Sequence, residues 1–282
     1  MAHTPPRLDP SEWEEELTEE FEEGSAGRTP IDPAEADPAA RSYWDAAADQ
    51  YQAEHGQFLG EGGVGFVWGP EGLTEAAAQL LGPIGDLAGR RVLEVGCGAA
   101  QCSRWLAAHA ALAIGIDISV RQLQHAHGAP VAAASATALP FGDGLFAAAF
   151  ASYGAVQFVA DLDRLLAEVH RVLVPGGRWV FAVTHPIRWA LPDSPDADGL
   201  TVGCSYFDRT PYVERDGSGR ATYAEFHRTI ADYFGALLRG GFAVESVVEP
   251  EWPVGHERVW GGWSPLRGRL VPGTLVVAAR AT

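Results

Sequence analysis

The chain has 282 residues and a formal net charge of −17, with 47% hydrophobic and 20% charged residues, a composition typical of a globular protein. The charge argues against nucleic acid or an anionic membrane surface as the partner, because both require a basic face. No apolar run reaches the roughly 18 residues of a membrane span, and no secretory signal pattern is present at the N-terminus. The three cysteines make no even disulfide framework and no zinc-like cluster. We therefore expect a cytoplasmic protein with reduced cysteines, no metal, and no nucleic-acid or membrane partner.

Much of the negative charge lies in residues 1–40, which hold 12 acids and 2 arginines. Residues 12–23 place Trp13, Leu17 and Phe21 one turn apart, which favours a short helix. Such a helix fits either a solvated tail or a flap that closes over a site. The segment 24–40 is rich in Pro, Gly and Ala and is typical of a linker.

Residues 41–88 are expected to form a helical cap. Ser42 is a suitable residue for a helix start. Trp44, Tyr51 and His55 then follow with helical spacing and share one mostly apolar face. This face fits either a plain core contact or a cover over a binding site.

From residue 89 onward, short apolar strands alternate with helices. Continuous apolar strands separated by helices indicate a parallel sheet covered on both faces. The expected strands are 92–95, 112–116, 130–134, 145–151, 178–184, 243–248 and 275–279.

The most informative segment is 92–101, with the sequence VLEVGCGAAQ. A strand there leads into a turn that contains Gly96 and Gly98, and then into a helix. Such a turn lets the backbone approach a ligand, and the start of the helix offers free N–H groups. Asp117 follows Glu94 by 23 residues and ends the next strand, where a carboxylate can accept both hydroxyls of a ribose. The pattern predicts a nucleotide cofactor.

Residue types narrow the choice of cofactor. The dinucleotide fingerprint needs a small residue at the position of Gln101. The phosphate-binding loop of nucleotide hydrolases needs a lysine, and the chain has none. A nicotinamide-dependent oxidoreductase is therefore disfavoured, although it stays an alternative.

Three ordered motifs resemble the class I S-adenosylmethionine-dependent methyltransferases, most closely the small-molecule enzymes of the ubiquinone and menaquinone biosynthesis type. The resemblance covers residues 90–184. It implies an α/β, Rossmann-like sheet, mostly parallel with an antiparallel last strand, flanked by helices and carrying an N-terminal helical cap and a substrate-pocket insertion. The motifs are EVGCG at 94–98 with Asp117, LPFGD at 139–143, and RVLVPGG at 171–177.

The resemblance implies S-adenosylmethionine as the cofactor and S-adenosylhomocysteine as its product. It places the glycines at the methionine moiety, Asp117 at the ribose, and Ser152 at the methionine amine and the sulfonium. Ser135 stands where the family often has Asp, which leaves adenine recognition mainly to the backbone of Ala136 and Thr137. The whole contact set that the resemblance implies is Glu94, Gly96, Cys97, Gly98, Gln101, Asp117, Ile118, Ser135, Ala136, Thr137, Ser152 and Tyr51.

Several members of this set also fit plain structural roles. The hydroxyls of Ser135 and Ser152 suit a turn or a helix cap. Cys97 and Cys102 suit small buried packing positions, because nothing in the sequence marks a reactive thiolate.

Methyl transfer from a sulfonium is an in-line displacement, so the protein mainly aligns the acceptor and excludes water. A base is needed only when the acceptor must lose a proton. His185, at the C-terminal end of strand 178–184, is the expected base. Tyr153 is expected to orient the acceptor or to contact the sulfonium. Each also fits a structural role, His185 as the end of a strand before Pro186 and Tyr153 as a pocket wall.

The acceptor is expected to be a small aromatic or mixed apolar and polar molecule, methylated at an O, N or C atom. Its pocket is expected in residues 186–224, because a long segment without periodicity inside a compact domain is usually functional. The tryptophan-rich loop 252–263 fits either a pocket wall or packing at the sheet edge. The expected acceptor contacts are His55, also a candidate second base, Trp189, Tyr206, and Arg188 with Arg209 for an anionic acceptor.

The predicted organisation is an acidic tail and linker (1–40), a helical cap (41–88) and an S-adenosylmethionine-binding methyltransferase domain (89–282) with the acceptor-pocket insertion at 186–224. Two other functions stay open besides methyl transfer. One is a non-catalytic S-adenosylmethionine-binding or regulatory module, compatible with Ser135, and the other is the oxidoreductase. A monomer and a homodimer are both compatible with the sequence.

Overall fold

The computed structural model describes residues 24–60 and 65–282. Within these ranges the chain forms a seven-stranded sheet of order β4-β3-β2-β5-β6-β10-β9. In this sheet β10 alone runs in the direction opposite to the other six strands, so the predicted mostly parallel sheet with an antiparallel last strand is confirmed. The strands are β2 (Arg91–Val95), β3 (Leu112–Asp117), β4 (Val131–Ala133), β5 (Phe146–Ala151), β6 (Leu173–Thr184), β9 (Phe242–Val248) and β10 (Thr274–Ala281).

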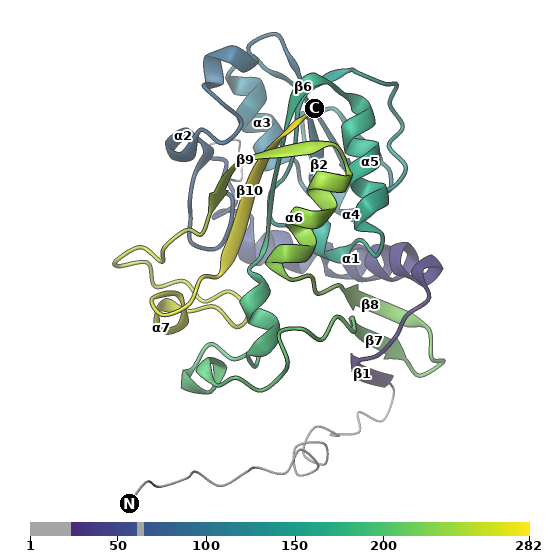
Figure 1. Cartoon of the computed structure of the whole chain (residues 1–282), viewed down its shortest axis with the longest axis vertical. Coiled ribbons are helices and arrows are strands. Elements are labelled where there is room, and N and C mark those ends of the chain that lie inside the picture. The colour runs from purple at the N-terminus through teal and green to yellow at the C-terminus, as the bar shows by residue number, and fades with distance from the viewer. Residues whose placement is uncertain (1–23, 61–64) are drawn as a thin grey trace, which may run out of the picture.

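Helices cover both faces of this sheet (Figure 1). Along β6, Trp179 and Phe181 enter the core on the face of α5 and α6, whereas Val180 and Ala182 enter the core on the face of α3. Successive side chains of a strand point to opposite faces, which explains why these strands are continuous apolar runs. The helices are α2 (Glu75–Ala78), α3 (Gln101–Ala108), α4 (Val120–Leu123), α5 (Leu162–Val172), α6 (Ile230–Arg239) and α7 (Pro265–Gly268).

The segment 24–40 differs from the expected linker. It contains β1 (Gly24–Arg28) and the first turns of α1 (Pro33–His55). The helix therefore begins nine residues before the expected start at Ser42, and its N-cap is Asp32, whose side chain accepts a hydrogen bond from the Ala34 N–H at 2.9 Å. The Pro-rich composition was misleading, because proline is favourable at the first helical position.

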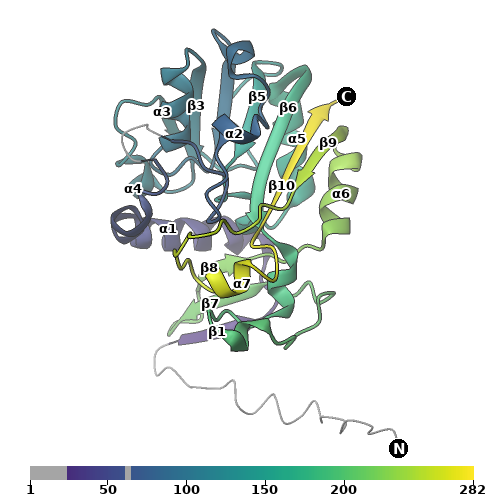
Figure 2. The same cartoon turned by 90° about the vertical axis from the view of Figure 1, so that its left-hand side faces the viewer.

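A second, smaller sheet joins the N-terminal part to the insertion. In it, β1 pairs antiparallel with β7 (Tyr212–Asp216), which pairs with β8 (Ala221–Glu225). Ala39 of α1 packs with Val213 and Ala224 of this sheet. Helix α1 thus lies between the two sheets, beside the ends of β2 and β3 (Figures 1 and 2). The remainder of the insertion has two 3-10 turns, Pro186–Ala190 and Ala197–Leu200.

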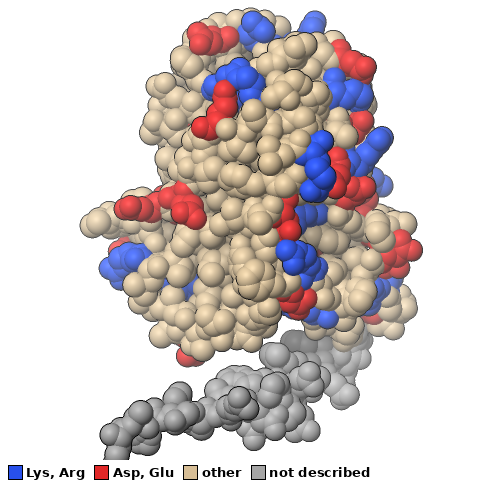
Figure 3. Space-filling view, in the orientation of Figure 1, with Lys and Arg blue, Asp and Glu red and all other residues tan. Residues whose placement is uncertain are grey.

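The predicted helix over 12–23 lies outside the described residues. No helix in the described part of the chain is long and apolar enough to cross a membrane. On the face drawn in Figure 3, acidic and basic side chains are interspersed rather than gathered into one basic surface.

Candidate active site

The turn after β2 requires glycine for two physical reasons. Gly96 and Gly98 have φ values of 71° and 51°, in the left-handed region that favours glycine. A Cβ atom at Gly96 would also lie 2.6 Å from the Cβ of Ala155, in the segment after β5. Ala100 is left-handed as well, with φ 55°, although it carries a side chain. The turn is therefore packed directly against the end of a neighbouring strand.

Asp117 ends β3 beside this turn. Its Oδ2 accepts a hydrogen bond from the Gly98 N–H and its Oδ1 accepts one from the Ser119 N–H, both at 2.8 Å. Burial raises the pKa of Asp117, while these backbone bonds act in the opposite direction. A carboxylate has about four lone-pair sites, so both oxygens can accept further hydrogen bonds from a ligand.

Glu94 connects β2 to the beginning of α3. Its Oε2 accepts hydrogen bonds from the Ser103 N–H at 2.9 Å and from the Ser103 hydroxyl at 2.5 Å. Burial raises the pKa of Glu94 to about 7, and the Ser103 bonds only partly offset this effect. Glu94 is therefore a buried carboxyl that titrates near neutral pH.

These groups line a cavity at the ends of β2, β3 and β5, which we call the sheet-end cavity. Its described lining holds three carboxyl side chains, those of Asp37, Glu94 and Asp117, and no Arg or His. The structure brings together in this lining all residues of the cofactor set implied by the sequence except Thr137, namely Glu94, Gly96, Cys97, Gly98, Gln101, Asp117, Ile118, Ser135, Ala136, Ser152 and Tyr51.

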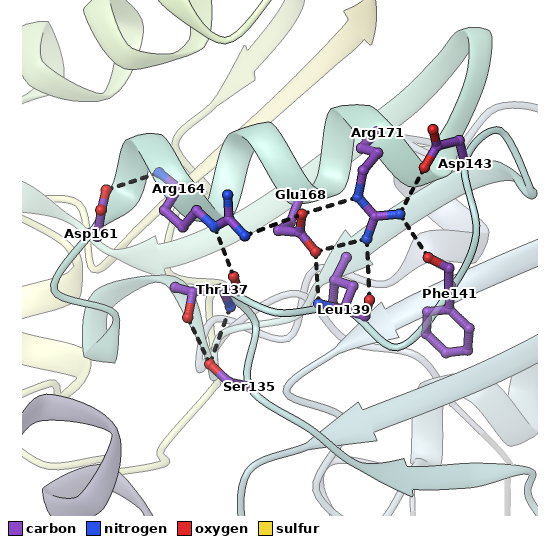
Figure 4. Close-up of polar contacts among 9 residues, drawn as sticks. All are labelled: Ser135, Thr137, Leu139, Phe141, Asp143, Asp161, Arg164, Glu168 and Arg171. Carbon is purple, nitrogen blue, oxygen red and sulfur yellow. Dashed lines mark hydrogen bonds and ion pairs between the residues drawn. The ribbon is translucent and has the colours of Figure 1, made fainter. Parts of the chain in front are cut away.

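The segment after β4, which carries Ser135 and Thr137, is held by Arg171 of α5 (Figure 4). Arg171 donates hydrogen bonds to the carbonyls of Leu139 at 3.1 Å and Phe141 at 2.7 Å. It also pairs with Asp143 and Glu168. Arg171 of the RVLVPGG motif thus binds residues of the LPFGD motif, and this contact holds the segment that forms one wall of the cavity.

Two serines of the lining also hold the backbone. The Ser135 hydroxyl lies 2.9 Å from the Thr137 hydroxyl and accepts a hydrogen bond from the Thr137 N–H at 3.2 Å. The Ser152 hydroxyl donates to the carbonyl of Val67 at 2.6 Å. Thr137 itself is not part of the cavity lining, and its carbonyl accepts a hydrogen bond from Arg164 at 3.1 Å.

Helix α1 closes the sheet-end cavity through a chain of amides. Gln101 Nε2 donates to Gln52 Oε1, and Gln52 Nε2 donates to Gln122 Oε1, both at 2.8 Å. Asp45 of the same helix accepts from the Ser119 hydroxyl at 2.7 Å and from the Arg121 N–H at 3.1 Å. Sequence reasoning missed Gln52, Gln122 and Asp45, because polar residues on a helix normally face solvent.

A second cavity, here called the aromatic cavity, adjoins the first. Four side chains line both cavities: Trp44, Tyr51, Tyr153 and Phe158. The rest of its described lining comes from α1, from the segment after β5, from the end of β6 and the region after it, from β8 and from the C-terminal loop. It includes Tyr43, Glu54, His55, Gln157, Thr184, Arg188, Asp193, Tyr223, Glu225, Trp260 and Trp263.

Tyr153 stands at the junction of the two cavities in a strained conformation. Its φ is 58°, a left-handed value that is uncommon for a bulky side chain and costs on the order of 1 kcal/mol or more. Burial raises the pKa of Tyr153, so its phenol is neutral and can donate a hydrogen bond. The sequence placed Tyr153 near the reacting atoms, and the structure brings it to both cavities.

The structure does not bring His185 to either cavity. Its Nδ1 accepts a hydrogen bond from the Ile187 N–H at 3.1 Å, and its Nε2 lies 2.8 Å from Glu249 Oε1. Burial lowers the pKa of His185, although Glu249 opposes this effect. Both ring nitrogens are therefore engaged in local contacts, so the structural alternative fits His185 better than the role of a base.

Part of the expected acceptor wall also lies elsewhere. Trp189 packs against His227, with ring centroids 5.1 Å apart. The Tyr206 hydroxyl accepts from the Ile230 N–H at 3.0 Å, and Arg209 pairs with Asp232. None of Trp189, Tyr206 and Arg209 lines either cavity. No pattern in the sequence indicates these placements, because aromatic residues that line a cavity and those that pack elsewhere look alike in a segment without periodicity.

Only part of the tryptophan-rich loop 252–263 forms a pocket wall. Trp260 and Trp263 line the aromatic cavity. Trp252 instead donates from its indole N–H to the His256 carbonyl at 2.7 Å, outside both cavities. In the described part of the chain no group of three or more His, Cys, Asp or Glu side chains is arranged to hold a metal ion.

Comparison with known proteins gives a consistent result. Residues 93–181 match the family described as "Methyltransferase domain". A malonyl-acyl-carrier protein O-methyltransferase from Pseudescherichia vulneris is 34% identical over 111 residues, which are 38% of this chain and 44% of the relative. A demethylmenaquinone methyltransferase from Tropheryma whipplei is 36% identical over 124 residues, which are 42% of this chain and 50% of the relative. The chain thus spans about half the length of these curated relatives.

Solved structures share the fold over a longer stretch. An S-adenosylmethionine-dependent methyltransferase from Mesorhizobium loti is 29% identical, with a TM-score of 0.57 over 75% of this chain and 100% of that one. A 1,6-didemethyltoxoflavin-N1-methyltransferase from Burkholderia thailandensis is 14% identical, with a TM-score of 0.56 over 94% of this chain and 98% of that one. The second likeness concerns the fold alone.

Proposed function

We propose that this protein transfers a methyl group from S-adenosylmethionine to a small-molecule acceptor, because residues 93–181 match the methyltransferase domain family, as the motifs at 94–98, 139–143 and 171–177 predicted. The donor occupies the sheet-end cavity and the acceptor occupies the aromatic cavity. The observation that carries the proposal is the wall shared by the two cavities, formed by Trp44, Tyr51, Tyr153 and Phe158.

The charges of the sheet-end cavity suit this donor. S-adenosylmethionine carries a positive sulfonium and a positive ammonium beside one carboxylate. The described lining offers the carboxyl groups of Asp37, Glu94 and Asp117 and no basic side chain. The pyrophosphate of a dinucleotide would meet these acids without a cation to balance it, which disfavours the oxidoreductase alternative further.

The donor contacts follow from the geometry of the turn. Asp117 accepts hydrogen bonds from the ribose hydroxyls while it keeps its bonds from Gly98 and Ser119. The turn at Gly96 and Gly98 brings the backbone close to the methionine moiety. Ser135 and Ala136 lie beside the adenine, and Ser135 acts mainly through the turn that it stabilises.

The bound donor supplies a methyl group that is already activated by the positive sulfur. The residues of this chain therefore have to align the acceptor and exclude water. Tyr153, which lines both cavities, orients the acceptor through its ring and its neutral hydroxyl. His185 holds the chain after β6 by its contacts with Ile187 and Glu249 and takes no proton from the acceptor.

The relatives differ in what their names say they methylate, one a malonyl group on a carrier protein and the other a demethylmenaquinone. For this chain we propose a free small molecule, because side chains of five separate segments bound the aromatic cavity. We also propose a cytoplasmic location without a nucleic-acid partner, supported by three free cysteines and the net charge of −17.

Isothermal calorimetry of the whole chain with S-adenosylmethionine and S-adenosylhomocysteine tests the proposal. We expect both to bind, and we expect NADH not to bind. Mass spectrometry of metabolites released from freshly purified protein, followed by label transfer from methyl-labelled donor, then identifies the acceptor. Absence of affinity for both adenosyl compounds in folded protein would refute the function. Tight binding without any methylated product would instead favour the regulatory module.

A further inference from the structure

The aromatic cavity carries more negative than positive charge. Its described lining has three carboxyl side chains, Glu54, Asp193 and Glu225, and one guanidinium, that of Arg188. Three negative charges against one positive charge leave an excess of two. The lining therefore repels an anion and attracts a cation.

Arg188 is already paired with two of these acids. Its Nη1 lies 3.2 Å from Glu225 Oε2, and its Nη2 lies 3.2 Å from Asp193 Oδ2. Glu225 also accepts a hydrogen bond from the Tyr223 hydroxyl at 3.1 Å. Both acids compete with an acceptor carboxylate for this guanidinium, so the expected role of Arg188 in fixing an anionic acceptor does not follow from the geometry.

The walls of the cavity are rings in edge-to-face contact. Trp44 and Tyr51 have centroids 5.3 Å apart, and Tyr153 and Trp260 have centroids 6.2 Å apart. Aromatic faces attract cations that lie within about 6 Å, most strongly in sites that exclude water. A planar ligand that carries a positive nitrogen matches both the walls and the charge of this cavity.

One buried acceptor atom in the lining lacks a donor. Gln157 is 5% exposed, and its Oε1 has no hydrogen-bond partner among the residues the structure describes. A buried carbonyl oxygen without a partner costs free energy. An N–H group of a ligand would satisfy this atom, whereas a carboxylate would not.

His55 provides a neutral base in the same wall. Its ring stacks on Trp260 with centroids 3.9 Å apart and an interplanar angle of 14°. Burial lowers the pKa of His55; Arg258, from the C-terminal loop, acts in the same direction, and Glu54 acts against it. Glu54 lies 3.9 Å from His55 Nε2 with a side chain that is 61% exposed, which gives a proton a route to solvent.

We propose that the acceptor is a small arylalkylamine, an amine whose nitrogen lies on an alkyl chain attached to an aromatic ring. The excess carboxylates bind it as its ammonium form, and His55 removes the proton that the nitrogen must lose. This inference rests on the proposed methyl transfer. The ammonium gives one proton to His55 and becomes a free amine. The nitrogen lone pair then forms the N–C bond as the C–S bond breaks, and the electron pair of the broken C–S bond stays on sulfur. The proton on His55 leaves through Glu54 to water.

The charge part is tested with probes of opposite charge on one ring. Calorimetry on the whole chain saturated with S-adenosylhomocysteine compares tryptamine, phenethylamine and benzylamine with indole-3-propionate and phenylpropionate. We expect the amines to bind at least about tenfold more tightly than the acids. Glu225→Gln should reduce this preference, whereas Glu214→Gln, on β7 and outside both cavities, should leave it unchanged.

The outcomes separate this inference from the function on which it rests. If S-adenosylhomocysteine binds but the acids bind as tightly as the amines, or no amine binds, the acceptor class is wrong and the donor site stands. If S-adenosylhomocysteine does not bind, the proposed function and this inference both fail.

The proposed role of His55 as the base is tested with His55→Gln and the amine that the unsubstituted protein methylates fastest. We expect kcat at pH 7 to fall about 100-fold, with the amine Kd within about threefold of the unsubstituted protein. The deficit should shrink as the pH rises toward about 10, because more amine then arrives as the free base. His109→Gln, outside both cavities, is the control. A loss of kcat that does not change with pH would mean that His55 is only part of the cavity wall and not the base.

Discussion

The two cavities are built from different parts of the chain. In the sheet-end cavity, backbone N–H groups and consecutive strand ends make the polar contacts, as at Gly98 and Asp117. In the aromatic cavity, side chains from α1, β8 and the two long loops form the walls. A site made by backbone is fixed by the fold itself, whereas a site made by side chains can change its ligand while the fold stays the same.

The two cavities also differ in how they hold buried charge. Glu94 has hydrogen bonds from Ser103 but no basic partner. Glu225, which is equally buried, pairs with Arg188. The first arrangement makes the protein sensitive to pH at the donor site, and the second sets the charge preference of the acceptor site. Four substitutions test this division.

Gly96→Ala should have the largest effect, because the new Cβ would lie 2.6 Å from the Cβ of Ala155 at a left-handed φ. We expect S-adenosylhomocysteine affinity to fall by more than about 100-fold, since small displacements in such a site are costly. Calorimetry measures this effect. The double variant Gly96→Ala/Ala155→Gly should recover most of the affinity. Gly128→Ala has a similar φ of 75° and no atom within 4 Å, so it should leave donor affinity unchanged.

Glu94→Gln should alter how stability depends on pH. The folded pKa of about 7 lies above the ordinary value of 4.5, so the native state binds the extra proton and stability falls as the pH rises from about 4.5 to 7. The difference corresponds to about 3 kcal/mol at pH 8. Urea unfolding at pH 5 to 8 should therefore show a flatter profile for Glu94→Gln than for the unsubstituted chain. Parallel profiles would contradict the buried titration, and the exposed Glu257→Gln serves as control.

Asp117→Asn keeps the side-chain shape but removes its charge. We expect S-adenosylhomocysteine affinity to fall about 10- to 100-fold, because hydrogen bonds to a charged group contribute about 1.5–3 kcal/mol. The binding of an amine in the aromatic cavity should change little in the same calorimetric experiment. An equal loss at both cavities would mean that Asp117 supports the fold and not the donor alone. Asp86→Asn, at an exposed position, is the matched control.

Gln52→Ala should have the smallest effect. It removes the hydrogen bonds to Gln101 and Gln122 that hold α1 over the sheet-end cavity. Each such bond contributes about 1 kcal/mol, so the dissociation rate of S-adenosylhomocysteine should rise about fivefold or more. Stopped-flow fluorescence gives this rate. Gln57→Ala, exposed just beyond the helix, should leave the rate unchanged. An unchanged rate for Gln52→Ala would mean that these hydrogen bonds of α1 do not slow the release of the donor product.

The sheet-end cavity was largely predictable from sequence because its residues follow strand ends in chain order. A glycine turn after one buried strand and an acid after the next define it locally. His185 shows the limit of this reasoning. It follows a strand end as expected, but its ring nitrogens contact Ile187 and the distant Glu249, and it lines neither cavity.

The aromatic cavity was less predictable because its walls come from segments far apart in sequence. Trp189 and Tyr206 were expected there and lie elsewhere. Tyr223, in the same expected segment 186–224, and Trp260, in the loop that was left with two alternatives, do line it. The beginning of α1 was missed for a different reason. Asp32 followed by Pro33 is a helix-start signal, but the proline-rich composition of the segment outweighed it.

The pairing of Gly24 with Asp216 in the small sheet has a consequence for synthesis on the ribosome. The strand β1 emerges early, and its partner β7 emerges nearly two hundred residues later. Until then the face of α1 that carries Ala39 has nothing to cover it. Contacts between such distant residues form slowly. The lining of the aromatic cavity extends to Trp263, so the nascent chain completes this cavity only near the end of translation.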